Sequence, residues 1–309
     1  MNNFDIFVDS GANIPDNLVK ERGFHVIPFY YRKGDVERLC YDESVPFSKI
    51  AKEFYTEMRA GAEFQTSLIN AQRFYEAIVP SLQAGRDVLL ITMASGISST
   101  HRQALEAKKM LEEEFPERKV FVIDSANASL GEGLLALRAA DLRDAGESVE
   151  AVAERIEHDV YHLNSYLTVE DLKYLRRSGR ISMARAIAGT LLNIKPVLRA
   201  DGDNPAHIVF YETQRGRRKA LSALAQSLRE RAFEPEKQTV AIAHCDCDED
   251  ANYLASLVRE IGVKDIIIEY YDLCSGSHVG PGTIALFFYG KDRREAEVAE
   301  EKRLFRKKS

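Results

Sequence analysis

One histidine, His278, stands in a segment that could hold a chemically active group close to the backbone. The segment, residues 274–282, reads CSGSHVGPG and is predicted to be a polar loop with three glycines. It separates two runs, 266–273 and 283–289, that are predicted to be strands. An imidazole there could be a general base, a metal ligand, a hydrogen-bond donor or a satisfied core residue. The segment alone leaves these interpretations open.

Hydroxyl groups form a second set of candidates, because they follow predicted strands in the first half of the chain. They belong to Ser10, Thr66, Ser67, Ser98, Ser99, Thr100 and Ser125. Ligands of parallel α/β sheets bind at the carboxyl ends of strands, so these residues could share one site. For any single residue, capping of the next helix is the commoner role. The run 98–100 exceeds one cap, and hydroxyls with free N–H groups at a helix start favour an anion.

Residues 244–250, HCDCDED, contain metal-ligand types, but their spacing does not match paired Cys-x-x-Cys or Cys/His zinc sites. The segment lies between a predicted strand and a predicted helix. We therefore interpret its last three acids as negative charge at a helix N-terminus and predict no metal site. The sequence also lacks a P-loop, a dinucleotide fingerprint and a Gly-x-Ser-x-Gly elbow.

Alternating strands and helices must position these groups. Strands are predicted at 4–8, 24–31, 87–93 and 119–123, and helices at 47–60, 71–82, 100–114 and 130–144. This order predicts a three-layer α/β domain with a mainly parallel sheet, over residues 1–163. Residues 164–309 are predicted to form an α+β domain with a mixed sheet, ending in a charged tail over 291–309. We expect a ligand cleft between the two domains.

The composition excludes several classes of protein. A net charge of −6 and a pI near 5.8 give no general attraction to nucleic acid or anionic lipid. The N-terminal residues do not read as a signal peptide, and no apolar run reaches the roughly 18 residues of a membrane span. We expect a cytoplasmic protein with reduced cysteines and no nucleic-acid partner.

The ordered set of motifs resembles the DegV family, the fatty-acid-binding proteins that include the FakB subunit of bacterial fatty acid kinase. The matching segments are Asp9-Ser10-Gly11-Ala12, Thr66-Ser67, Ser98-Ser99-Thr100, Val122-Ile123-Asp124-Ser125, and residues 172–181, 191–198 and 276–282. They run in the same order from Phe4 to Tyr289. This resemblance is far more specific than any single motif.

The resemblance implies a two-domain DegV-like fold with one long-chain fatty acid in a tunnel between the domains. It implies that Thr66, Ser98, His278 and Arg180 hold the carboxylate, and that Ser10, Ser67, Ser99, Ser125 and Gly280 lie nearby. It further implies a non-enzymatic carrier without a cofactor, which presents the carboxylate to a FakA-like, ATP-dependent kinase. Transient membrane contact for lipid exchange would accompany this role.

The chain departs from the family pattern after Thr66-Ser67, where Leu68-Ile69-Asn70 replaces Gln-Pro-Ser. This replacement bears on the shape of the entrance and on acyl-chain preference. An alternative function is a hydrolase or transferase for a small acyl or anionic substrate, with Ser98 as nucleophile and His278 as base. A third is a regulatory protein whose lipid is only structural.

Overall fold

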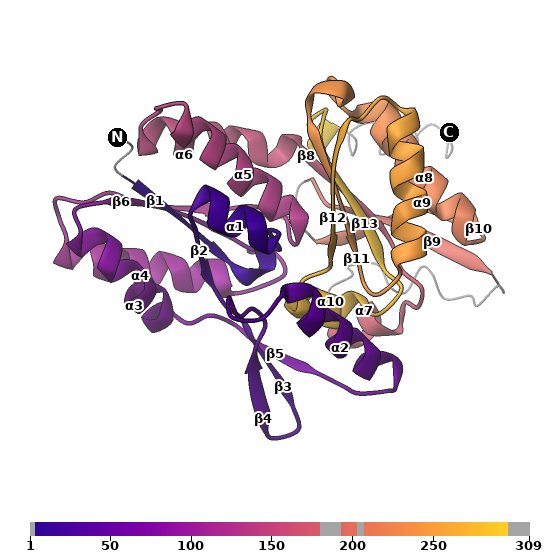
Figure 1. The fold of residues 1–309 in the computed structure, drawn as a ribbon, viewed down its shortest axis with the longest axis horizontal. Helices are drawn as coiled ribbons and strands as arrows, with labels where there is room; N and C mark the ends of the chain where they lie inside the picture. The colour runs from indigo at the N-terminus through magenta and orange to yellow at the C-terminus, as the bar shows by residue number, and fades with distance from the viewer. Residues whose placement is uncertain (1–3, 180–192, 203–206, 296–309) are drawn as a thin grey trace, which may run out of the picture.

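The structure, a computed structural model, describes residues 4–179, 193–202 and 207–295. Two large sheets stand side by side, with helices between them and outside them (Figure 1). A third, three-stranded sheet lies below the junction of the two.

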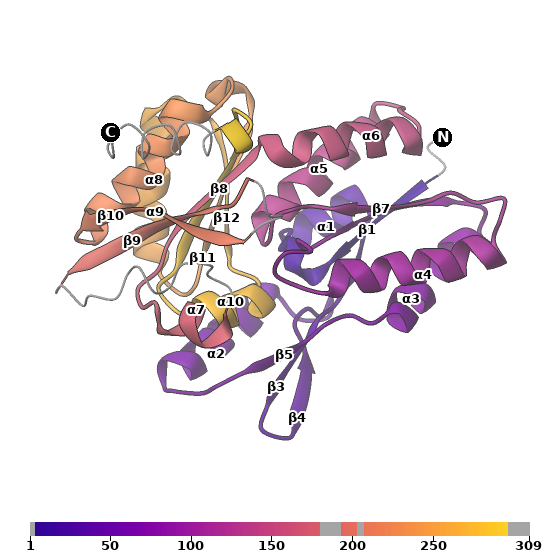
Figure 2. The ribbon, with the colours of Figure 1, turned by 180° about the vertical axis from the view of Figure 1, so that it is seen from behind.

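The first sheet is entirely parallel, with the order β2 (Phe24–Ile27), β1 (Phe4–Asp9), β6 (Asp87–Thr92), β7 (Val120–Asp124). Helices α3 (Ala71–Gln83) and α4 (Thr100–Glu114) cover one face, and α5 (Leu130–Asp144) and α6 (Val149–Asp159) cover the other (Figure 2). The short α1 (Asp16–Arg22) packs beside β2. The predicted three-layer arrangement is confirmed. Strand β6 is buried on both faces, as its continuous apolar run indicates.

The second sheet is mixed, as predicted. Its order is β10 (Ile208–Arg215), β9 (Ile194–Ala200), β8 (Leu163–Thr168), β13 (Ile284–Tyr289), β11 (Thr239–His244), β12 (Asp265–Tyr270). Only β11 and β12 form a parallel pair among these described strands. Helices α8 (Arg217–Arg231) and α9 (Asp248–Glu260) pack against this sheet, and the acids expected at a helix N-terminus open α9.

Helix α5 joins the two sheets, because it contacts β1 and β6 of the first and β8, β11 and β13 of the second. Its buried residues therefore lie all around the helix rather than along one stripe, as expected for a helix enclosed on both sides. Two short 3₁₀ turns flank this layer, Ser10–Ala12 after β1 and Val160–His162 after α6, and a third, Pro235–Lys237, precedes β11. The predicted boundary between domains at residue 163 stays a prediction.

The predicted single strand over residues 24–31 is wrong. It divides at Pro28 into β2 and β3 (Tyr30–Lys33), which belong to different sheets. Proline cannot donate to a strand ladder, so it ends β2 and lets the chain turn away. Strand β3 pairs with β4 (Val36–Leu39) and β5 (Gln65–Ser67), and the β3–β4 hairpin projects from the body of the protein (Figures 1 and 2).

The predicted polar loop at residues 274–282 is also wrong in part, because Leu273–Val279 forms helix α10. Its N-cap, Asp272, accepts a hydrogen bond from the backbone N–H of Ser275 at 2.7 Å. Gly276 lets α10 approach α2 (Phe47–Arg59), since a Cβ at this position would lie 1.9 Å from the Tyr55 hydroxyl. The Tyr55 hydroxyl itself donates to the Tyr271 carbonyl at 2.7 Å. Packing thus imposes a helix on a segment rich in glycine and serine.

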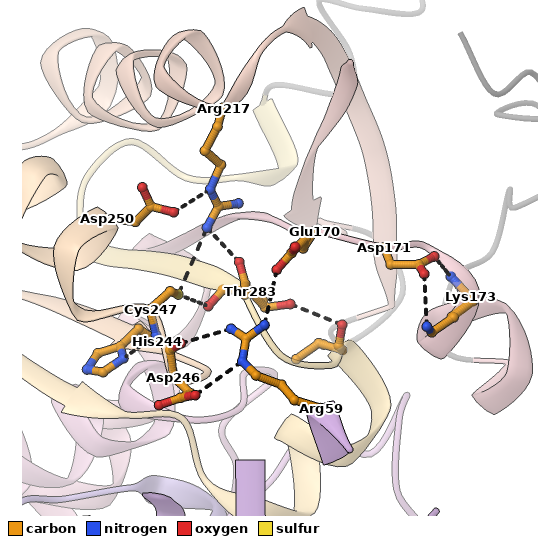
Figure 3. A network of polar contacts seen from close by, with 12 residues as sticks. Arg59, Glu170, Asp171, Lys173, Arg217, His244, Asp246, Cys247, Asp250 and Thr283 are labelled. Carbon is orange, nitrogen blue, oxygen red and sulfur yellow. Dashed lines mark hydrogen bonds and ion pairs between the residues drawn. The ribbon is translucent and has the colours of Figure 1, made fainter. Parts of the chain in front are cut away.

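A polar network joins α2 to the second sheet (Figure 3). Arg59 donates to the Asp246 carboxylate at 3.1 Å and to the Asp246 carbonyl at 2.9 Å. It also lies 3.7 Å from Glu170, which follows β8. The same carboxylate of Asp246 pairs with Lys52 of α2 at 2.5 Å. These contacts hold α2 against the end of the mixed sheet, beside α10.

The predicted charged tail, 291–309, is described as far as residue 295. Within this part, Arg293 is only 2% exposed and donates to the carbonyls of Ala126 at 2.8 Å and Leu163 at 3.3 Å. Burial lowers the pKa of its guanidinium to about 10. Residue 293 is thus a packed connection between the two sheets rather than a solvated tail. None of the helices in the described ranges is long and apolar enough to cross a membrane.

Candidate functional site

A cavity of about 470 Å³ lies where the two sheets, α10 and the β3–β5 sheet meet. This volume falls in the roughly 300–1,000 Å³ range of small-molecule sites. Its apolar lining includes Phe29, Leu68, Met93, Ile97, Leu167, Leu175, Ala200, Ile208, Val279, Ala285 and Phe287. Its polar lining includes Thr66, Ser67, Ser98, Ser99, Asn127, Ser165, Ser275 and His278. The cavity thus combines a large apolar wall with several hydroxyl groups and two imidazoles, those of His278 and His207.

Thr66 and His278 meet in this cavity although 212 residues separate them, with Thr66 Oγ1 at 3.1 Å from His278 Nε2. Thr66 is held by β5, where it pairs with Tyr31 of β3. His278 lies in the last turn of α10 and is half-buried in a helix whose other residues are buried. Protonation of Nε2 would direct that N–H to Thr66 and leave the Thr66 hydroxyl hydrogen for a ligand. The pair therefore offers an anion the Thr66 hydroxyl, oriented by the imidazole.

Ser98 and Ser99 line the cavity from the turn between β6 and α4. Ser98 Oγ lies 2.9 Å from Thr100 Oγ1 and accepts from the Thr100 N–H at 3.2 Å. Ser99 is the N-cap residue of α4 but makes no side-chain capping bond. Simple capping by Ser99 is therefore not the arrangement observed. Ser98 contacts Thr100, and the His278 imidazole contacts Thr66. A nucleophile and its base would contact each other, so this arrangement favours a set of hydrogen-bond donors.

Two aspartates at strand ends fix the turns that carry these hydroxyls. Asp9, at the end of β1, accepts from the N–H groups of Met93 at 2.7 Å and Gly11 at 2.8 Å. Asp124, at the end of β7, accepts from the N–H groups of Ser95 at 3.1 Å and Ala126 at 2.9 Å. Burial raises the pKa of the Asp9 carboxyl to about 7, although both backbone bonds act against this.

Three of the predicted residues lie one step behind the cavity and are not among its described lining residues. Ser10 accepts from the Phe29 N–H at 3.0 Å, and the buried Ser125 donates to the Asn127 carbonyl at 3.0 Å. Gly280 ends α10 with a φ of 86°, and a Cβ there would lie 2.2 Å from the Tyr174 ring. Each of them positions a neighbour rather than facing the cavity.

Arg180 lies outside the described residues, whereas Gly179, which ends α7 (Lys173–Ser178), lines the cavity. The departure from the family pattern also lies at this cavity. Leu68 lines it and is 44% exposed, Ile69 is fully buried, and Asn70 caps α3 by accepting from the Arg73 N–H at 3.0 Å. Leu68 therefore supplies an apolar side chain between the cavity and solvent.

Sequence reasoning missed Asn127 and Ser165, which face the cavity from opposite sheets. Asn127 lies in the turn after β7 and Ser165 lies on β8, and the Ser165 hydroxyl donates to Asn127 Oδ1 at 2.5 Å. Asn127 could have been identified from its place after a strand, alongside Ser125. Ser165 had no such signal, because it lies within strand β8 and not after the end of a strand.

The described residues, which include segment 244–250, contain no group of three or more His, Cys, Asp or Glu side chains arranged to hold a metal ion. His244 accepts from the Cys247 N–H at 3.3 Å, and Asp246 is engaged by Arg59 and Lys52. Burial lowers the pKa of His244. Its imidazole therefore serves the turn that leads into α9.

Comparison with known proteins decides the family. Residues 3–291 match the profile of the family described as "Uncharacterised protein, DegV family". The chain belongs to the DegV family. A DegV domain-containing protein of Clostridium perfringens is 36% identical over 291 residues, covering 94% of this chain and 98% of the relative.

Solved structures of DegV proteins have the same fold. A DegV family protein from Ruminococcus gnavus, described with vaccenic acid, gives a TM-score of 0.82 at 25% identity and covers 93% of this chain and 100% of its own. DegV from Bacillus subtilis, described as a fatty acid binding protein, gives a TM-score of 0.77 at 28% identity and covers 94% of this chain and 100% of its own. The family and the fold expected from the sequence are confirmed.

Proposed function

We propose that this DegV protein binds one long-chain fatty acid in the cavity between its two sheets and presents the carboxylate to a kinase. The acyl chain would lie against the apolar wall, and Thr66, Ser98 and His278 would bind the carboxylate. Arg180 is proposed as a fourth contact on the family resemblance alone. The chain would then act as a carrier and not as the phosphorylating enzyme.

The observation that carries this proposal is the contact between Thr66 and His278, which both line a largely apolar cavity. A fatty carboxylate is ionised at neutral pH, with a pKa near 4 like other carboxylic acids, so its removal from water requires several donors. The hydroxyls of Thr66 and Ser98 would provide such donors, with the His278 imidazole orienting that of Thr66. Each buried CH₂ contributes about 0.8 kcal/mol, so the chain supplies most of the affinity and the donors fix its orientation.

A binding titration tests the first part. Protein stripped of lipid is titrated with labelled palmitate or oleate, and we expect saturation at one fatty acid per chain. Ser98→Ala should bind more weakly, because it removes a hydroxyl donor from the proposed carboxylate site. Unchanged affinity in this variant would remove Ser98 from the site.

A reconstituted reaction tests the second part. A FakA-like kinase subunit with ATP should form acyl phosphate from the bound fatty acid only when this chain is present. Normal fatty acid binding without any acyl phosphate would contradict the carrier role and leave the binding role standing. Transient contact with a membrane belongs to the same proposal, and transfer of labelled fatty acid from vesicles would measure it.

A further inference from the structure

Ser165 brings a hydroxyl group to the apolar wall of the cavity. It lies on β8 and pairs with Phe287 of β13, and both residues line the cavity. Ala200 of the neighbouring strand β9 and Leu167, two residues further along β8, line the same wall. Ser165 retains an exposed fraction of 9%, whereas Phe287 retains 2%. A polar oxygen thus borders the space in which an acyl chain would lie.

The orientation of this hydroxyl is fixed by Asn127. The Ser165 hydroxyl donates its hydrogen to Asn127 Oδ1 at 2.5 Å. Asn127 is 1% exposed and is held by its own bonds, since Nδ2 donates to the Ser125 carbonyl at 3.1 Å and the Asn127 carbonyl accepts from the Ala94 N–H at 2.9 Å. A serine oxygen that has donated its hydrogen keeps its lone pairs as acceptors. The wall therefore carries an acceptor whose own donor is already engaged.

A saturated hydrocarbon beside this oxygen would leave its acceptor sites without a partner, and buried acceptors without partners are costly. We infer that the cavity accommodates a fatty acid that carries a hydroxyl group along its chain, with that hydroxyl donating to Ser165 Oγ. This inference rests on the proposed function, because it takes the carboxylate to lie at Thr66 and His278. It adds hydroxylated long-chain fatty acids to the substrate class.

A purely structural role for Ser165 makes a different prediction. The bond between Ser165 and Asn127 also connects β8 to the turn after β7, so its loss would lower stability. Such a loss would affect every fatty acid alike. The measurement that separates the two roles is the ratio of affinities for hydroxylated and unsubstituted acids of equal length.

The experiment compares stearic acid with a series of hydroxystearic acids that differ in the position of the hydroxyl. For the unaltered protein, affinity should peak at one position along the chain, at or above the affinity for stearic acid. Ser165→Ala should lower the preference for that isomer about tenfold, the order expected for loss of one buried hydrogen bond. Ser178→Ala is the matched control, because Ser178 also lines the cavity but its hydroxyl donates to the Leu175 carbonyl.

Each outcome decides the matter. A lower preference in Ser165→Ala alone supports the inference. A flat series, or equal changes in both variants, overturns it while binding of stearic acid keeps the proposed function intact. If neither stearic nor hydroxystearic acid binds the unaltered protein, the proposed function itself is wrong. Thermal unfolding of both variants shows whether their folds are retained.

Discussion

Replacement of Thr66 by valine examines the carboxylate site with almost no change in shape. Valine retains the branched side chain on β5 but loses the hydroxyl that lies 3.1 Å from His278 Nε2. A hydrogen bond to a charged group contributes about 1.5–3 kcal/mol. We therefore expect Thr66→Val to weaken fatty acid binding by about 10- to 150-fold.

A sharper test is whether Thr66→Val weakens the binding of a charged ligand more than that of an uncharged one. Palmityl alcohol has the same chain as palmitic acid but no charge, so its affinity should fall clearly less, by about the 0.5–1.5 kcal/mol of a neutral hydrogen bond. Thr66→Ser retains the hydroxyl and should restore most of the affinity for the acid. Isothermal titration of lipid-free protein with both ligands measures these differences.

Thr213→Val is the matched control, because Thr213 is exposed on the edge strand β10 and does not line the cavity. It should leave both affinities unchanged. Equal losses for acid and alcohol in Thr66→Val, or no loss for either, would refute the assignment of Thr66 to the carboxylate.

Two further predictions concern the elements that form the site. Gly276→Ala should destabilise the protein by about 1–3 kcal/mol, because the new Cβ would lie 1.9 Å from the Tyr55 hydroxyl; urea unfolding measures this, and unchanged stability would contradict the close packing of α10 on α2. Glu132 of α5 is fully buried, and neither of its carboxyl oxygens has a hydrogen-bond partner within the described part of the chain; burial raises the pKa of this carboxyl well above 4.5. Because the folded-state pKa lies above 4.5, the stability contributed by the protonated carboxyl is fully present below pH 4.5. This stability is lost as the pH rises through the folded-state pKa. The free energy of unfolding of Glu132→Gln, relative to the unaltered protein, should therefore increase with pH, and a difference that is constant with pH would contradict the protonated state of Glu132.

Much of the fold follows from local patterns in the sequence. The continuous apolar run of β6 and the helical spacing of the apolar residues in α3 identify these two elements, because the pattern of apolar residues reflects which side chains are buried. Pro28 indicates that residues 24–31 divide into two strands, but the apolar residues on both sides of it favour a single strand. Helix α10 had a signal only in its cap, Asp272, because glycine and serine disfavour a helix that tertiary packing nevertheless imposes.

The arrangement of the site could be predicted less well from local sequence patterns. The hydroxyls of Ser98 and Ser99 could be located at a strand end, and their place beside the cavity follows from the parallel sheet. The meeting of Thr66 with His278 depends on how β5 packs against α10, which no spacing in the sequence specifies. Only resemblance to a family linked these two residues in advance. The role of Ser165 in the cavity wall likewise depends on the contact between the two sheets.

The most direct test of the central claim is the mass of the protein as purified. Mass spectrometry under native conditions should find an excess mass equal to one long-chain fatty acid, which disappears on denaturation and is recovered as free fatty acid in the extract. Palmitate or oleate added to stripped protein should restore the excess. A protein that carries no fatty acid and also fails to take up either acid would contradict the account.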